Sequence, residues 1–168
     1  MTGRAGLLLL LMIILLPTTV AASPVILTIT GNIRHQGESL EQLEFTLEQL
    51  QALPQRELTT AHLWAREPHR YLGPDLALLM ETLFGHARIT TLHLEGLNGY
   101  SVAVDWPALA PHQPILAWQE NGKTMSRRDK GPLWLLLPFE RLSEPQLSDF
   151  RHYMVWQLHK IRVFTEPR

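Results

Sequence analysis

The stretch ILAWQENGKTMSRRDKGPLWLLLP, residues 115–138, decides the fold of this chain. Its apolar ends, 115–119 and 133–137, enclose a polar segment that begins with the turn Asn121-Gly122. An Asn-Gly pair between apolar stretches is a strong signal for a hairpin. The nearly continuous apolar run at 133–137 is typical of a strand that is buried on both faces. The stretch therefore predicts two core strands linked by a long polar connection.

Further strands are predicted on both sides of this stretch. Apolar alternation and β-branched or aromatic content indicate strands at 25–29, 57–64, 89–95, 100–104 and 155–164. Turns are expected at Gly31-Asn32, after the first of these strands, and at Asn98-Gly99, between two later ones. The sequence therefore predicts a chain rich in short strands.

Helices are predicted at 46–54, 74–85 and 143–152. Thr46 with Gln49 three residues later forms a capping-box pattern. Pro74 is expected at the first helical position of the second helix, which Gly85 ends. Short strands interrupted by two or three short helices predict an α+β fold with mixed β-sheets, in preference to a doubly wound sheet.

The composition excludes several classes of function. The 168 residues contain no cysteine, which excludes a disulfide framework, thiolate-bound zinc or iron–sulfur clusters, and a cysteine nucleophile. With 15 basic and 16 acidic residues, the chain has no overall field to attract nucleic acid or an anionic membrane surface. The charge is uneven, however: residues 123–168 carry 9 basic and 5 acidic side chains, a local excess that suits an anionic group or a solvated face.

The N-terminus has the pattern of an export signal. Arg4 precedes the apolar run 7–16, and Pro17 and the small residues at 20–23 follow it. The run is shorter than the roughly 20 residues that span a bilayer. We expect residues 1–22 to be a cleavable signal peptide and residues 23–168 to form a single domain in the periplasm, which does not span the membrane after cleavage. A short buried helix or an uncleaved anchor is the alternative.

Motif searches predict no catalytic residue and no metal ligand. The chain contains no GxSxG, HExxH, Walker or GxGxxG motif. Of its eight histidines, no two are four residues apart on a predicted helix, so histidine spacing does not indicate a metal site. The carboxylates near predicted turns are also too scattered to indicate paired acid–base chemistry.

Polar and aromatic residues in the predicted loops are the remaining candidates for a binding site. An aromatic ring can stack on a planar heterocycle, and amides and guanidinium groups can bind its polar edges or an anionic tail. The alternative is a core tryptophan at a strand end with basic residues on a solvated hairpin. The candidate ligand-binding residues are Trp64, Arg66, Asn98, Tyr100, Asn121, Arg127 and Lys130.

The order of segments resembles the oxidoreductase molybdopterin-binding domain, the sulfite-oxidase-like fold. The most specific element is Leu-Ala, then Asn-Gly after three intervening residues, then Gly-Pro and an apolar strand ending in proline. The matching stretches cover nearly all of the predicted domain: LTITGNI (27–33), FTLEQLQALP (45–54), YLGPDLALLMETLFG (71–85), LNGYSVAV (97–104), residues 115–138 and WQLHKIRV (156–163).

Family members that use molybdenum bind it through a cysteine in the loop after the third matched strand. This chain has ELTTAHLWAREPHR at residues 57–70, with Trp64 on or next to that position, and it has no cysteine elsewhere. Molybdenum held by a protein thiolate is therefore excluded. The chain is more similar to a short exported branch of the family, the periplasmic pterin-binding regulators, which keep a pterin pocket without the metal.

This resemblance implies a secreted, non-catalytic protein that binds a pterin, either a reduced pterin or a molybdopterin-like one. It also implies a partner, the periplasmic domain of a membrane-bound cyclic-di-GMP enzyme. Asn98 and Tyr100 correspond to the family's Asp-Gly-Tyr turn, with asparagine in place of aspartate, and Asn121, Arg127 and Lys130 to its Asn-Gly and Gly-Pro hairpin. Two alternatives remain: a molybdopterin-dependent redox protein without a thiolate ligand, and an interaction domain with a vestigial pocket.

Overall fold

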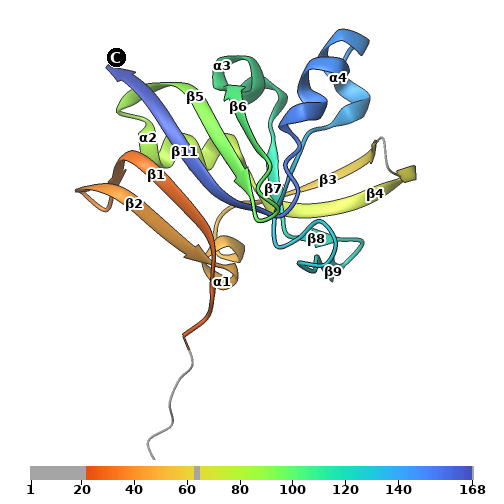
Figure 1. Cartoon of the computed structure of the whole chain (residues 1–168), viewed down its shortest axis with the longest axis horizontal. Helices are drawn as coiled ribbons and strands as arrows, with labels where there is room; N and C mark the ends of the chain where they lie inside the picture. The colour runs from red at the N-terminus through yellow and green to blue at the C-terminus, as the bar shows by residue number, and fades with distance from the viewer. Residues whose placement is uncertain (1–21, 63–64, 168) are drawn as a thin grey trace, which may run out of the picture.

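The computed structural model describes residues 22–62 and 65–167, which form three β-sheets and several short helices (Figure 1). The predicted signal peptide, apart from Ala22, lies outside the described residues. Within the described ranges, no helix combines the length and apolar character that a membrane crossing requires.

A five-stranded sheet brings the two ends of the domain together. Its order is β2-β1-β11-β5-β6, in which β1 and β11 pair in parallel and the other neighbours are antiparallel. The last strand therefore lies in the middle of the sheet, next to the first. The strands are β1 (Val25–His35), β2 (Glu38–Thr46), β5 (Ala87–Gly96), β6 (Ser101–Asp105) and β11 (Leu158–Pro167).

Two smaller sheets complete the β structure. One has the order β3-β4-β8-β9, and the other is the antiparallel pair β7-β10. In Figure 1 the β3–β4 hairpin extends away from the large sheet. These strands are β3 (Gln55–His62), β4 (Ala65–Pro74), β7 (Ile115–Ala117), β8 (Gln119–Glu120), β9 (Lys123–Thr124) and β10 (Trp134–Leu136).

The helices of the described residues are all short. Three of the α-helices fall within the predicted ranges, and α3 is additional, so the described part has four where two or three were expected. The α-helices are α1 (Leu47–Gln51), α2 (Leu76–Phe84), α3 (Trp106–Leu109) and α4 (Glu144–Phe150). The 3-10 helices are η1 (Ala110–His112), η2 (Phe139–Arg141) and η3 (Arg151–Tyr153).

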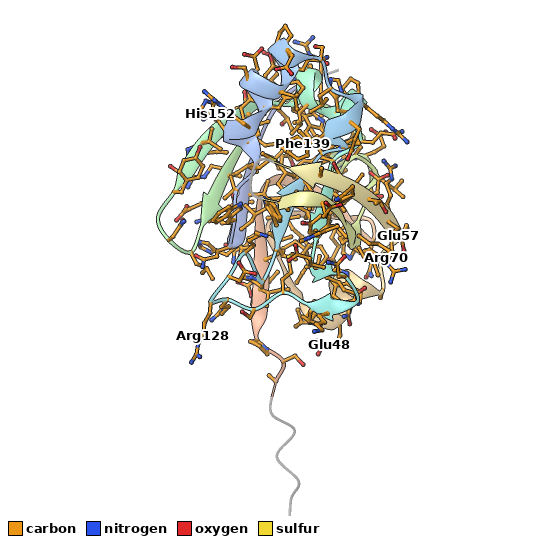
Figure 2. The ribbon with its side chains drawn as sticks, turned by 90° about the vertical axis from the view of Figure 1, so that its right-hand side faces the viewer. Glu48, Glu57, Arg70, Arg128, Phe139 and His152 are labelled. Carbon is orange, nitrogen blue, oxygen red and sulfur yellow. The ribbon has the colours of Figure 1, made fainter. Side chains whose placement is uncertain are left out.

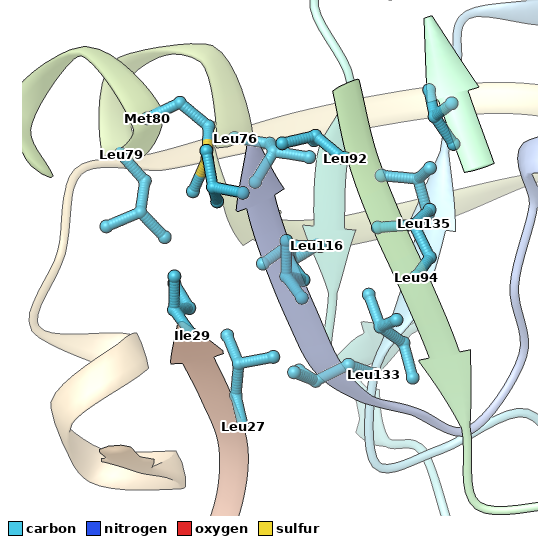
Figure 3. Packing of buried hydrophobic residues seen from close by; sticks show 14 of the residues in the cluster. Leu27, Ile29, Leu76, Leu79, Met80, Leu92, Leu94, Leu116, Leu133 and Leu135 are labelled. Carbon is cyan, nitrogen blue, oxygen red and sulfur yellow. The ribbon is translucent and has the colours of Figure 1, made fainter. Parts of the chain in front are cut away.

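The β7-β10 pair separates two hydrophobic clusters. Leu116, Leu133 and Leu135 belong to the larger cluster, which α2, β1 and β5 complete (Figure 3). The alternate residues Ile115 and Trp134 belong to a second cluster on the other face. All residues of 133–137 have no exposed surface, so the prediction of a strand buried on both faces is confirmed. Burying each such leucine contributes about 1.5–3 kcal/mol.

One predicted turn and one predicted strand differ from the structure. The chain does not turn at Gly31-Asn32: β1 continues through this pair with a bulge between Thr30 and Ile33, and the hairpin turn follows at 36–37. Gly31 has φ +148°, and a Cβ there would lie 2.9 Å from the Val163 carbonyl oxygen, so the bulge requires glycine. The predicted strand 115–119 is divided between β7 and β8, which belong to different sheets.

The second helix begins later than predicted. Pro74 is the last residue of β4, and Asp75 is the N-cap, whose side chain accepts a hydrogen bond from the Leu78 N–H at 3.1 Å. The helix ends at Gly85 as expected, although Gly85 keeps a right-handed conformation. The β2 and β4 strands were not predicted.

Candidate functional site

The β5–β6 turn places Asn98 and Tyr100 beside the last part of the chain. Gly99 adopts φ +82°, and Asn98 Oδ1 accepts a hydrogen bond from the Tyr100 N–H at 3.0 Å. The Tyr100 hydroxyl donates to the His152 carbonyl oxygen at 2.9 Å. This bond ties the turn to η3, which is more than 50 residues away in the sequence. The predicted turn at Asn98-Gly99 is confirmed.

A hollow of about 250 Å³ opens between the turn and η3. Met154 and Trp156 provide its apolar part, and the other lining residues are polar or amphipathic: Asn98, Tyr100, Arg151 and His152. A second hollow of about 360 Å³ shares Arg151 and extends along α4 to Phe139. Figure 2 faces this end of the molecule, with His152 and Phe139 in the upper half and Arg128 at the lower left.

The loop 126–131 lies on the other side of the segment 155–158. The Leu97 N–H donates to the Gln157 carbonyl oxygen at 2.9 Å, and the Gln157 N–H donates to the Lys130 carbonyl oxygen at 2.8 Å. Two groups of predicted site residues, Asn98 with Tyr100 and Arg127 with Lys130, are therefore held next to the same short segment.

Behind the loop, Glu120 organises a partly buried polar network. Its Oε1 accepts a hydrogen bond from the Tyr71 hydroxyl at 2.8 Å and lies 2.7 Å from His69 Nδ1. Lys130 Nζ lies 3.6 Å from the same oxygen. The Glu120 and Lys130 side chains are only 17% and 14% exposed, so this contact is shielded from solvent.

The network fixes the protonation states of Glu120 and Tyr71. Burial raises the pKa of Glu120, but hydrogen bonds from His69 and Tyr71 and the charge of Lys130 outweigh burial, and the pKa lies below its ordinary value. Burial, reinforced by the bond to Glu120, raises the pKa of Tyr71 far above its ordinary range. At neutral pH Glu120 is therefore a carboxylate and Tyr71 keeps the proton that it donates.

A ladder of aromatic rings connects this network to the hollow. Tyr71 and Trp134 are edge-to-face at 5.6 Å between ring centroids, and Trp134 and Trp156 are edge-to-face at 6.1 Å. Lys130 Nζ lies 4.8 Å from the centroid of the Trp134 ring, in cation–π contact. Trp134 is fully buried, whereas Trp156 is partly exposed and lines the hollow. The ladder therefore gives Trp156 a rigid support.

Of the remaining predicted site residues, those that the structure describes do not line the hollow. Asn121 adopts φ +48° in the β8–β9 turn, and its Oδ1 accepts a hydrogen bond from the Arg70 N–H at 2.9 Å. Arg127 is exposed. Arg66 lies in β4, near the tip of the β3–β4 hairpin. Trp64 lies outside the described residues. Ligand binding by all seven predicted residues stays a prediction.

Most residues that line the hollow are not among the predicted site residues. The predicted last strand includes Trp156, although β11 begins only at Leu158, and the predicted third helix includes Arg151 and His152. The network at Glu120 was missed because β4 and β8 bring its members together across about 50 residues. An aromatic residue close to the start of a strand, after a polar segment, is a signal by which Trp156 could have been found.

The side chains offer few ligands for a metal ion. Among the residues that the structure describes, no group of three or more histidine, aspartate or glutamate side chains is placed to hold a metal ion. The sequence provides no cysteine for a thiolate ligand. The donor set thus does not fit molybdenum bound through protein sulfur, but an aromatic face with amide, imidazole and guanidinium groups around it fits a planar polar heterocycle.

Comparison with known proteins identifies the fold. No protein-family model matches the chain, and no curated protein matches it. Among solved structures it is similar to the sulfane dehydrogenase SoxCD from Paracoccus pantotrophus, with a TM-score of 0.57 and 17% sequence identity over 84% of this chain. The chain spans only 38% of the length of that chain. The likeness confirms the predicted α+β, sulfite-oxidase-like fold.

Proposed function

We propose that this protein binds a pterin-type heterocycle in the hollow beside Trp156 and does not itself catalyse a reaction. The observation that carries the proposal is the composition of the hollow: one partly exposed tryptophan surrounded by Asn98, Tyr100, Arg151 and His152. A pterin is a flat aromatic ring with several hydrogen-bond donors and acceptors on its edge. Small-molecule sites commonly combine such an apolar face with a few converging polar groups.

Trp156 supplies the face on which the ring stacks. Its position is fixed by the edge-to-face contact with the buried Trp134, so little conformational entropy is lost on binding. The Tyr100 hydroxyl is already bonded to the His152 carbonyl, which leaves the phenol ring of Tyr100 to border the ligand. The Asn98 amide nitrogen and the His152 ring are the groups that would bind the polar edge of the pterin.

Two arginines, one in the hollow and one in the adjoining loop, are available to bind a substituent of the ring. Arg151 lines both hollows, and Arg127 is exposed in the adjoining loop. A guanidinium group donates in a planar fork that suits hydroxylated or anionic substituents. The chain has no cysteine, so no protein thiolate can bind molybdenum at this site. This supports a role in binding the ligand.

Titration calorimetry with 6-hydroxymethyl-7,8-dihydropterin tests the proposal. We expect the parent chain to bind and W156L to bind at least about tenfold more weakly, because stacking of a base on an aromatic side chain contributes roughly 1–3 kcal/mol. R151A should also weaken binding. The matched control is F164A, which removes another exposed aromatic, 47% exposed, from β11. No binding by the parent, or equal binding by W156L and the parent, contradicts the proposal.

A redox protein is the second candidate, and the likeness to a sulfane dehydrogenase favours it. In that case the same hollow would hold a molybdopterin-type cofactor through its pterin and phosphate. Elemental analysis of protein purified from its native compartment distinguishes the two candidates. Stoichiometric molybdenum supports the redox candidate, and its absence from protein that carries a pterin supports the binding protein.

Export and signalling are further parts of the proposal. The pattern of residues 1–22 supports cleavage after Ala22, export to the periplasm and a single mature domain at 23–168. The resemblance to periplasmic pterin-binding regulators supports a membrane-bound cyclic-di-GMP enzyme as the partner that distinguishes the loaded from the empty protein. Such a partner must bind the two states with different affinities. N-terminal sequencing of the periplasmic form and co-purification with and without the pterin test these two points.

A further inference from the structure

Gln157 occupies the point where the two sides of the candidate site meet. It follows Trp156 directly, its carbonyl oxygen accepts the Leu97 N–H at 2.9 Å, and its N–H donates to the Lys130 carbonyl oxygen at 2.8 Å. One residue therefore bonds through its backbone to the turn 97–100 on one side and to the loop 126–131 on the other.

The side chain of Gln157 adds two bonds to the same loop. Its Nε2 donates to the Arg127 carbonyl oxygen at 2.8 Å and to the Asp129 carbonyl oxygen at 3.2 Å. An amide nitrogen has two protons, so both bonds can form at once. The remaining backbone bonds of the loop, from Asp129 and Gly131 to the Ser126 carbonyl oxygen, shape it internally and do not attach it to the rest of the domain.

The backbone of Gln157 is in a conformation that glutamine rarely adopts. Its φ is +52°, in the left-handed region, where a Cβ is unfavourable and where glycine or asparagine is more usual. Such a conformation persists only where the surrounding contacts determine it. Glycine and asparagine would suit this backbone better, but neither has a side chain long enough to reach two carbonyls of the loop.

We propose that Gln157 is a positioning residue, which holds the loop 126–131 against the turn 97–100 and so fixes the shape of the site around Trp156. The effect of this arrangement on ligand affinity rests on the proposed pterin binding. The attachment of the loop does not, and it can be measured without any ligand.

Limited trypsin digestion of the full chain measures the attachment directly. Arg127 and Arg128 are exposed cleavage sites within the loop, and Arg162 in β11, the middle strand of the large sheet, reports global unfolding. When opening is fast, the cleavage rate follows the population of the open form. We expect Q157N and Q157G to raise cleavage in the loop roughly tenfold or more, because two amide hydrogen bonds are lost. Cleavage after Arg162 should stay within about twofold of the parent.

Gln113 provides a matched control. It has φ +56° at the end of η1 and bonds to Arg56 and Ala110 and not to the loop, so Q113N and Q113G change the same backbone conformation without removing a bond to the loop. These variants should leave cleavage in the loop unchanged. Equal loop cleavage in Q157N, Q157G and the parent overturns the proposal. It would show that the Gln157 side chain does not hold the loop, because both variants keep the backbone bonds and lose the side-chain bonds.

Two further arms complete the test. Should the shorter variants unfold, Q157E decides: it keeps the length but cannot donate to the two carbonyls, so selective cleavage of the loop supports the proposal and unchanged cleavage overturns it. Calorimetry with 6-hydroxymethyl-7,8-dihydropterin should show about tenfold weaker binding by Q157N. If the parent binds no pterin, the proposed function fails while the digestion still decides the role of Gln157.

Discussion

Glu120 is the residue on which the polar network behind the candidate site depends. Its carboxylate accepts a hydrogen bond from the Tyr71 hydroxyl, lies next to the His69 ring and forms an ion pair with Lys130. Lys130 in turn makes a cation–π contact with the Trp134 ring. Removing the charge would leave Lys130 partly buried without its counter-ion and Tyr71 with a weaker acceptor, a combination that is costly in a shielded environment.

The first prediction concerns the pH dependence of stability. The folded-state pKa of Glu120 is below its ordinary value of 4.5, so its contribution to the free energy of unfolding is complete above that pH and is lost as pH falls through the lower folded value. E120Q should therefore be about 1–3 kcal/mol less stable than the parent at pH 7. The difference should shrink below pH 4.5.

Urea unfolding at a series of pH values measures this difference. E57Q is the control, since the Glu57 side chain is 57% exposed and its ion pair with Arg70 is long, at 4.0 Å. A gap between the parent and E120Q that stays constant from pH 7 to pH 3 would refute the role given to the Glu120 charge.

Individual residues were predictable where local rules determine their place. Thr46 and Gln49 form the expected capping box, and Gly99 and Gly122 have the positive φ that Asn-Gly turns require. Trp156 was not predicted as a site residue, because its importance comes from the hollow that two separate segments, 98–100 and 151–156, form around it. Sequence spacing contains no information on such a meeting of segments.

The cap of α2 shows how one residue connects a helix to its surroundings. Asp75 accepts the Leu78 N–H, and its carboxylate also forms an ion pair with Arg56 of β3. The apolar face of α2, with Leu76, Leu79 and Met80, packs into the large cluster. The cap therefore determines where a core helix begins.

The second prediction follows from this double role. D75A should lower the free energy of unfolding by roughly 1–2 kcal/mol, because it removes both the cap and the ion pair. D75N, which caps a helix as well as aspartate does, should lose less than D75A. Thermal unfolding of the two variants side by side checks the order, and equal loss in both would show that the cap contributes little.

Strands could be predicted from the pattern of apolar residues where both faces of the strand, or the whole of one face, are buried. The run at 133–137 was identified because every residue is apolar, and β5 because its buried residues largely alternate with more exposed ones. The edge strand β2 has Leu40 and Leu43 three residues apart and mostly exposed neighbours, a spacing that resembles a helix. The β4 strand includes Pro68 and Pro74, and its pairing with β3 overrides a poor local preference for strand.

In the whole domain, the last third of the chain completes both the large sheet and the hollow. The strand β11 enters the large sheet between β1 and β5, and the residues just before it supply Trp156 and Gln157. The loop 126–131, the turn 97–100 and the segment 151–157 meet only in the folded chain. The fold class followed from patterns along the sequence and from the order of its segments, while the site required this tertiary arrangement.

The central claim is that the hollow beside Trp156 holds a pterin. Mass spectrometry of the small molecules released from protein purified from its native compartment tests it most directly, with W156L prepared in parallel. The account predicts a pterin in the parent sample and its loss, or a decrease of at least about tenfold, in W156L. No pterin in the parent, or the same amount in both samples, would contradict it.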